Sequence, residues 1–199
     1  MSPSKPTAKK TATPAAQPAA ERRAAEAELK RLVALFSPNQ QKLAFAVRRW
    51  MQKRLKTAFE LVYEYRDCFV VSFSPNAHGY QGVLVLRGSE DGVRLYLNRG
   101  KGLADPAKLL QGTGGLVRWI PVESAATLKR PEVVQLVDLA VAANEVPFPR
   151  TGKGPVILQS APKKKPASKP AKDRSASKSA VRTKSSRSSA ASPRARARG

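Results

Sequence analysis

Cysteine and histidine are almost absent from this chain, and their scarcity excludes several kinds of site. The 199 residues include one cysteine, Cys68, and one histidine, His78. One cysteine cannot form an intramolecular disulfide, and it cannot build a thiolate-rich zinc site. One histidine likewise excludes a triad of histidine ligands. We therefore expect no metal and no cofactor, and this cysteine usage fits a reducing compartment.

Long apolar runs are also missing. No uninterrupted apolar stretch approaches the ~20 residues of a membrane-spanning helix, and the N-terminus lacks the apolar core of a secretory signal. Residues 1–20 contain three lysines and no acid, a composition loosely similar to that of an organellar transit peptide. Because they contain no arginine and no amphipathic pattern, we favour a disordered arm. We expect a cytoplasmic protein without a membrane partner.

Acidic residues are few beside the basic ones. The chain has 37 Lys or Arg and 14 Asp or Glu, a formal net charge of +23. Residues 160–199 alone hold thirteen Lys or Arg and one acid, Asp173, separated by Ala, Ser and Pro. So little apolar surface cannot offset the ~1–2 kcal/mol per residue of backbone ordering entropy. The composition predicts a disordered polycationic tail.

A polycation of this density binds nucleic acid by releasing counterions from phosphates, without recognising bases. We expect the tail to contact DNA or RNA in this way. Its composition resembles that of the tails of bacterial linker-histone-like proteins. Such contacts would associate the protein with the nucleoid. The alternative is a solubilising spacer. The residues predicted to contact phosphates are Lys163, Lys164, Lys165, Lys169, Lys172, Arg174, Lys178, Arg182, Lys184, Arg187, Arg194, Arg196 and Arg198.

Between the flanks, the spacing of apolar residues changes from helical to strand-like and back. Three- and four-residue steps predict helices over 21–36 and 38–55, with Ser37 and Gln40 in a capping box. Period-two alternation predicts strands near 59–65, 68–74, 82–87, 93–98 and 116–122, and a last helix follows at 131–144. Asp105-Pro106 can open a short helical turn.

These elements predict an α+β domain at residues 21–150, between a disordered arm at 1–20 and a tail at 151–199. Its short connections favour an antiparallel sheet of four to five strands, with two N-terminal helices and one C-terminal helix packed on one side.

Several segments resemble the YdhG-like family, a bacterial domain of unknown function. The resemblance spans residues 37–143 and is carried by ELVYEY at 60–65, FVVSFSP at 69–75, GLADP at 102–106, LLQGTG at 109–114, Val117-Arg118, Leu128 and RPEV at 130–133. It implies an α+β sheet domain and no particular activity. Some members are described as frataxin-like iron chaperones. That role needs a carboxylate-rich surface, and the net positive charge of the domain argues against it here.

The glycine-rich segment 100–118 is the strongest candidate for a small-ligand or anion site. Glycines let backbone N–H groups approach an anion, but the segment has neither the Walker spacing nor the dinucleotide fingerprint. We favour a structural connection whose glycines adopt positive φ angles. If a ligand binds there, the predicted residues are Asp105, Gly112, Gly114 and Arg118, with Tyr63 and Tyr65.

The remaining candidates have plainer interpretations. Tyr63, Tyr65, Tyr96 and Trp119 could stack on bases, but Glu60 and Glu64 interleave the first strand and would repel phosphates, so we favour packing. We interpret His78 as an exposed loop residue and Cys68 as a buried small hydrophobe.

A basic helix face, formed by Arg48, Arg49, Lys53, Arg54 and Lys56, could add phosphate contacts. No nucleophile elbow or other catalytic motif is present. The sequence thus favours a non-catalytic domain tethered to nucleic acid by its tail. A ligand-binding protein or enzyme that uses residues 100–118 is the alternative.

Overall fold

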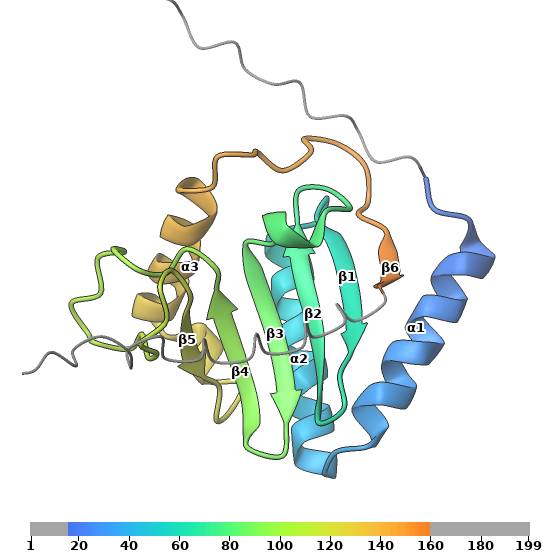
Figure 1. Ribbon diagram of the computed structural model, residues 1–199, viewed down its shortest axis with the longest axis horizontal. Coiled ribbons are helices and arrows are strands. Elements are labelled where there is room, and N and C mark those ends of the chain that lie inside the picture. Colours follow the sequence, from blue (N-terminus) through green and yellow to red (C-terminus); the bar gives the residue numbers. More distant parts are fainter. Residues whose placement is uncertain (1–15, 160–199) are drawn as a thin grey trace, which may run out of the picture. The chain divides into compact units, whose positions relative to one another are not determined.

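Six strands form a single mixed sheet in the computed structural model, which describes residues 16–159 (Figure 1). The α-helices are α1 (Ala19–Ala34), α2 (Pro38–Arg54) and α3 (Pro131–Ala142). The strands are β1 (Phe59–Glu64), β2 (Cys68–Ser74), β3 (Leu84–Ser89), β4 (Gly92–Leu97), β5 (Arg118–Pro121) and β6 (Val156–Gln159). The predicted α+β class is confirmed.

The boundary between α1 and α2 is set by local hydrogen bonds that the sequence predicts. Ser37 Oγ accepts the N–H of Gln40 at 3.4 Å, and Gln40 Oε1 accepts the N–H of Ser37 at 3.1 Å. Pro38 stands at the first helical position, where its missing N–H costs nothing. The predicted capping box is confirmed, and it fixes where α2 begins.

The sheet has the order β5-β4-β3-β2-β1-β6. Neighbours from β5 to β1 are antiparallel, as predicted, whereas β6 pairs with β1 in parallel. β6 was not predicted, and residues 151–159 were expected to belong to the tail. The folded unit therefore reaches Gln159, beyond the predicted boundary at residue 150, because the short apolar run at 156–158 adds an edge strand.

All three α-helices cover the same face of the sheet, with α2 and α3 behind the central strands in Figure 1. The register brings apolar residues of neighbouring strands opposite one another on this face, as in the row Val71, Leu86, Leu95 and Ile120. These residues belong to one buried core that also contains Leu29, Val47, Met51, Val133 and Leu136. We call this side the helix face and the other side the outer sheet face.

One predicted element is reduced to a single turn. The N–H of Lys108 donates to the Asp105 carbonyl at 3.1 Å, and residues 105–110 form no helix. Instead, the Asp105 carboxylate accepts the N–H groups of Leu109 at 3.0 Å and Leu110 at 2.8 Å. A side chain that satisfies these backbone donors removes the need for a helix there.

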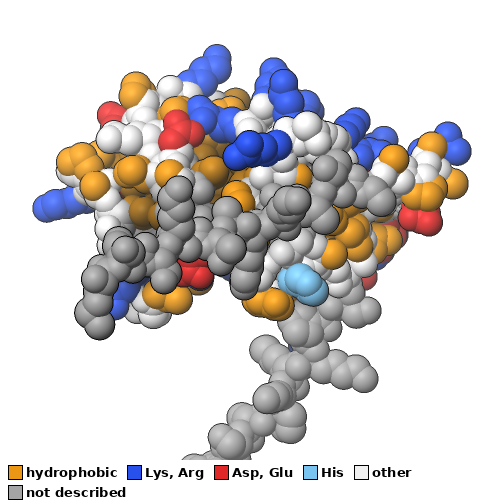
Figure 2. Space-filling view, turned by 90° about the horizontal axis from the view of Figure 1, so that it is seen from above, with side chains coloured by type: hydrophobic (Ala, Val, Ile, Leu, Met, Phe, Trp, Pro, Cys, Tyr) orange, Lys and Arg blue, Asp and Glu red, His pale blue; other side chains and the backbone are white. Residues whose placement is uncertain are grey.

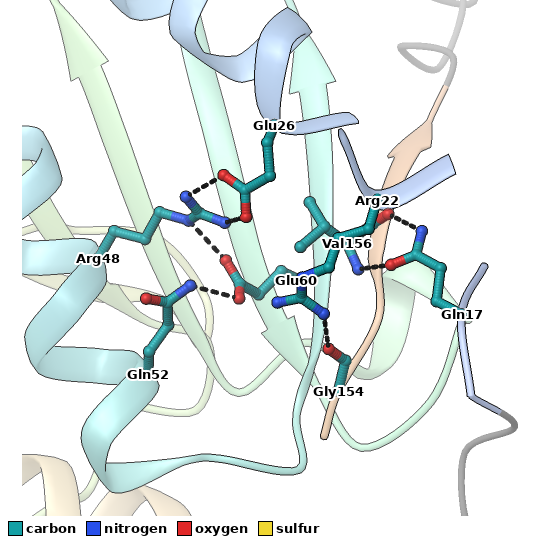
Figure 3. A network of polar contacts seen from close by, with 8 residues as sticks. All are labelled: Gln17, Arg22, Glu26, Arg48, Gln52, Glu60, Gly154 and Val156. Carbon is teal, nitrogen blue, oxygen red and sulfur yellow. Dashed lines mark hydrogen bonds and ion pairs between the residues drawn. The ribbon is translucent and has the colours of Figure 1, made fainter. Parts of the chain in front are cut away.

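A buried guanidinium joins α1, α2 and β1 (Figure 3). Arg48 of α2 is 7% exposed. Its Nε donates to Glu60 Oε2 at 2.6 Å, and its two Nη atoms donate to the two carboxylate oxygens of Glu26, each at 2.7 Å. Gln52 donates to the other Glu60 oxygen at 2.7 Å. A buried charge is tolerated only when it is paired and hydrogen-bonded in this way.

The same network fixes the last strand. Gln17 donates to the carbonyl of Val156 at 2.6 Å and accepts its N–H at 2.9 Å, and Arg22 donates to the carbonyl of Gly154 at 3.0 Å. Gln17 and Arg22 therefore attach the N-terminal end of α1 to β6 and to the residues just before it.

We expect Arg48→Met to lower the free energy of unfolding by about 3–5 kcal/mol, because the Glu60 carboxylate would stay buried without its cation. Urea unfolding followed by circular dichroism measures this loss. The neighbouring exposed Arg49→Met is the matched control and should change stability by no more than about 0.5 kcal/mol. Equal effects of the two substitutions would contradict the structural role of Arg48.

The network also makes stability depend on pH. The hydrogen bond from Arg48 holds the pKa of Glu26 below its ordinary value of 4.5. The stabilisation from this pair is therefore complete above pH 4.5 and is lost as the pH falls through the lowered pKa. Glu26→Gln removes the titrating group, so we expect the variant to lose less stability than the parent protein between pH 5 and pH 3. Urea midpoints across that range test it, and parallel curves would refute it.

Candidate nucleic-acid interface

Two rows of side chains cross the outer sheet face. The register aligns Tyr63, Val70, Arg87, Arg94 and Pro121 in one row, from β1 to β5. It aligns Leu61, Ser72, Val85, Tyr96 and Trp119 in the next. None of the three α-helices in residues 16–159 packs on this face. The short 3₁₀-helix η1 (Gly79–Gln81) and Gly82 lie against Tyr63 and Ser72, so the face is covered toward β1 and β2. Its arginines and aromatic rings are half-buried.

Two arginines lie directly opposite each other in the middle of this face. Arg87 of β3 pairs in register with Arg94 of β4. Directly opposed like charges destabilise a sheet, and the described residues offer little compensation. They place no carboxylate within ion-pair distance of Arg87, and Arg94 has only Asp91, at 3.8 Å. Both cations would attract an anion that binds to this face.

Aromatic rings and a thiol hold these arginines in place. The Cys68 thiol and the Tyr96 hydroxyl raise the pKa of Arg87, which donates to Tyr96 Oη at 3.4 Å. The Arg94 guanidinium lies over the Trp119 ring, 4.4 Å from its centroid. The rings of Tyr96 and Trp119 are 6.3 Å apart. Cys68 is half-buried at this face rather than buried as a small hydrophobe.

The argument that acids on β1 would repel phosphates from the aromatic residues is wrong. Successive side chains of a strand point to opposite faces, so Glu60 and Glu64 lie on the helix face while Tyr63 lies on the outer sheet face. Glu60 is buried beside Arg48, and Glu64 pairs with Arg31 at 2.9 Å. The cations between the aromatic residues come from Arg87 of β3 and Arg94 of β4, and the sheet register is what places them there.

A cavity of about 860 Å³ adjoins the Trp119 end of the outer sheet face. It lies between the first turns of α2, the beginning of β4 and the end of β5. Its lining includes Lys42, Leu43, Arg94, Gln111, Trp119 and Glu123. Gln111 and Trp119 exchange backbone hydrogen bonds of 2.8 and 3.0 Å, so the glycine-rich segment extends the sheet beside β5.

The glycine-rich segment satisfies its own polar groups, as the favoured interpretation predicted. Arg118 donates to the carbonyls of Gly114 at 2.6 Å and Val117 at 2.7 Å. The Asp105 carboxylate occupies N–H groups that a bound anion would otherwise use. Gly102 and Gly112 have positive φ angles, 87° and 108°. These contacts leave the anion-loop hypothesis without support at Asp105 and Arg118.

The predicted ligand residues do not form one site. Tyr63 lies on β1 and Tyr65 just after it, whereas Gly112 and Gly114 precede β5 and Arg118 is its first residue. Three strands separate β1 from β5, a distance of roughly 19 Å at the usual strand spacing. Tyr63 and Tyr65 contact each other, with ring centroids 6.4 Å apart.

The predicted basic helix face is smaller than expected. Arg48 is buried in the carboxylate network, so its assignment to this face is wrong. Arg54 pairs with Asp138 at 2.7 Å and lies over the Trp50 ring. Arg49, Lys53 and Lys56 are exposed. In Figure 2, Lys and Arg side chains lie along the upper side of the view, with acidic side chains among them toward its left.

Other predictions concern single residues, metals and membranes. His78 is an exposed loop residue, as predicted, and stacks with Tyr80 at 5.6 Å. Residues 16–159 contain no group of three or more His, Cys, Asp or Glu placed to hold a metal ion. No helix in that range is long and apolar enough to cross a membrane. The phosphate-contacting residues predicted from Lys163 to Arg198 lie outside the described residues.

Comparisons of the chain with protein-family models, with curated proteins and with solved structures find no match. The resemblance to the YdhG-like family therefore stays a prediction.

The position of Trp119 depends on a glycine. Gly112 has φ 108°, and a Cβ added there would lie 3.2 Å from Cδ1 and Nε1 of Trp119. We expect Gly112→Ala to destabilise the protein by about 1–3 kcal/mol, from backbone strain and displacement of the indole. Gly114→Ala is the matched control, because its Cβ would meet only an ordinary contact, 3.9 Å from the Val117 carbonyl oxygen. Thermal unfolding compares them, and equal melting temperatures would refute the role of Gly112.

Proposed function

We propose that this protein is a non-catalytic nucleic-acid-binding module, in which the outer sheet face receives single-stranded nucleic acid and the basic tail adds non-specific phosphate contacts. The observation that carries this proposal is the pair Arg87 and Arg94, which lies beside Tyr96 and Trp119 on a face that none of the three described α-helices covers.

Each part of that face suits single-stranded nucleic acid. Base–aromatic stacking is worth about 1–3 kcal/mol per base and tolerates any sequence. Arginine guanidinium groups bind phosphates through several N–H donors and also stack on bases. In duplex DNA the base faces are stacked on one another, so stacking on Tyr96 or Trp119 favours a single strand over a duplex.

The tail gives the proposal its second support. With thirteen cations and one acid, residues 160–199 would raise affinity for any polyanion without distinguishing bases. Linking two weak binding segments in one chain raises the effective concentration of the second. The proposal keeps the YdhG-like assignment of the domain and a cytoplasmic, nucleoid-associated location as its expected setting.

We expect a chain ending at Gln159 to bind a labelled single-stranded octanucleotide more weakly than the full chain and with a shallower salt dependence. Fewer cations release fewer counterions, so the slope of log K against log salt falls in magnitude. Fluorescence anisotropy between 50 and 300 mM salt measures both quantities. Identical affinity and slope for the two chains would show that the tail contributes nothing.

The outer sheet face is tested separately in the full chain. Arg87→Ala should weaken single-strand binding about fivefold or more, because it removes charge-assisted hydrogen bonds to phosphate. Arg23→Ala is the matched control, since it removes one positive charge from an exposed position on α1. If both variants lose affinity equally, only net charge matters and the proposed face is wrong.

A further inference from the structure

The cavity beside Trp119 has the size and the mixed lining of a small-molecule site. Its volume of about 860 Å³ lies within the roughly 300–1,000 Å³ typical of such sites. Apolar walls come from Leu43, Val93 and Pro121. Two side chains of the outer sheet face, Arg94 and Trp119, form part of the same lining, so the cavity and the face are continuous.

Some polar groups of the lining already have hydrogen-bond partners within the protein, and others do not. Gln40 is committed, because its Nε2 donates to the carbonyls of Ser89 at 2.9 Å and Glu90 at 3.1 Å. Gln111 is held through its backbone, by its hydrogen bonds with Trp119. Its side-chain amide has no hydrogen-bond partner among the described residues, and neither has the ammonium of Lys42. These two groups can serve a ligand.

Groups of the lining, including Gln111 and Lys42, match the parts of a nucleotide. The indole of Trp119, with the Arg94 guanidinium over one of its faces, offers an aromatic surface for a planar base. An amide donates and accepts hydrogen bonds, as the edge of a base requires. Lys42 and Arg94 supply positive charge for a phosphate. Asp91 and Glu123 also line the cavity and can accept hydrogen bonds from amino or ribose hydroxyl groups.

We propose that this cavity binds one nucleotide unit, with the base against Trp119, its edge at Gln111 and its phosphate near Lys42. The inference rests on the proposed function, because Arg94 and Trp119 belong to both the cavity and the outer sheet face. The unit is either a free mononucleotide or one nucleotide of a bound single strand that leaves the stack at the edge of the sheet.

Nuclear magnetic resonance of the ¹⁵N-labelled full chain can distinguish these sources. The protein has two tryptophans, so the indole N–H of Trp119 reports on the cavity and that of Trp50, which does not line it, is an internal control. Trp119→Phe identifies the reporting signal. The ligands are the four nucleoside 5′-monophosphates, ribose 5-phosphate as the control without a base, and a single-stranded octanucleotide.

We expect a ligand with a base to shift the Trp119 signal, while ribose 5-phosphate does not and Trp50 stays unchanged. Shifts with mononucleotides identify a free nucleotide as a ligand, and shifts with the octanucleotide alone identify a nucleotide of the strand. Gln111→Ala should weaken the binding reported by Trp119 about three- to tenfold, through loss of hydrogen bonds to the base edge. Gln135→Ala, an exposed glutamine on α3, is the matched control and should change nothing.

The inference is overturned if no ligand shifts Trp119, if ribose 5-phosphate shifts it as much as the nucleotides, or if Gln111→Ala binds like the parent protein. These results leave the proposed function intact when Arg87→Ala still weakens octanucleotide binding more than Arg23→Ala. If that difference is absent as well, the outer sheet face and the cavity are both refuted as nucleic-acid sites.

Discussion

The arrangement of the domain depends on one buried guanidinium. Arg48 can stay in the interior only because Glu26 and Glu60 surround it with carboxylate oxygens. Glu26 comes from α1, Arg48 from α2 and Glu60 from β1, so their contact requires both helices to lie on the same side of the sheet (Figure 3). Since α3 packs on that side too, the apolar core is one-sided, and on the opposite face the arginines and aromatic rings stay half-buried.

That one-sided cover explains why the two faces of the sheet differ in composition. The side under the helices collects apolar residues, with Glu60 as a paired exception. The outer sheet face instead carries arginine, tyrosine and tryptophan beside smaller residues such as Ser72 and Val85, at positions that alternate with the core residues along each strand. An arginine pair such as Arg87 and Arg94 contributes nothing to the core, and both of its cations would attract an anionic partner.

The glycine-rich segment has a structural role that also shapes the cavity. Its polar groups are satisfied by Asp105 and Arg118 instead of being left for an anion. Its backbone pairs with Trp119, and Gly112 lets the chain pass close to the indole ring. The segment resembles a phosphate loop in composition, but its role is to form part of the cavity lining. It places Gln111 at the edge of the cavity.

The sequence by itself determined the α+β class, the capping box at Ser37 and most of the strands, because these follow from local periodicity and capping chemistry. It also determined the basic character of the tail. It did not determine the parallel strand β6 or the burial of Arg48, since both depend on contacts between residues distant in the chain. Only the tertiary structure decided which residues share a face. It placed the acids of β1 under the helices and aligned Arg87 with Arg94, because strand register is set by packing over the whole sheet.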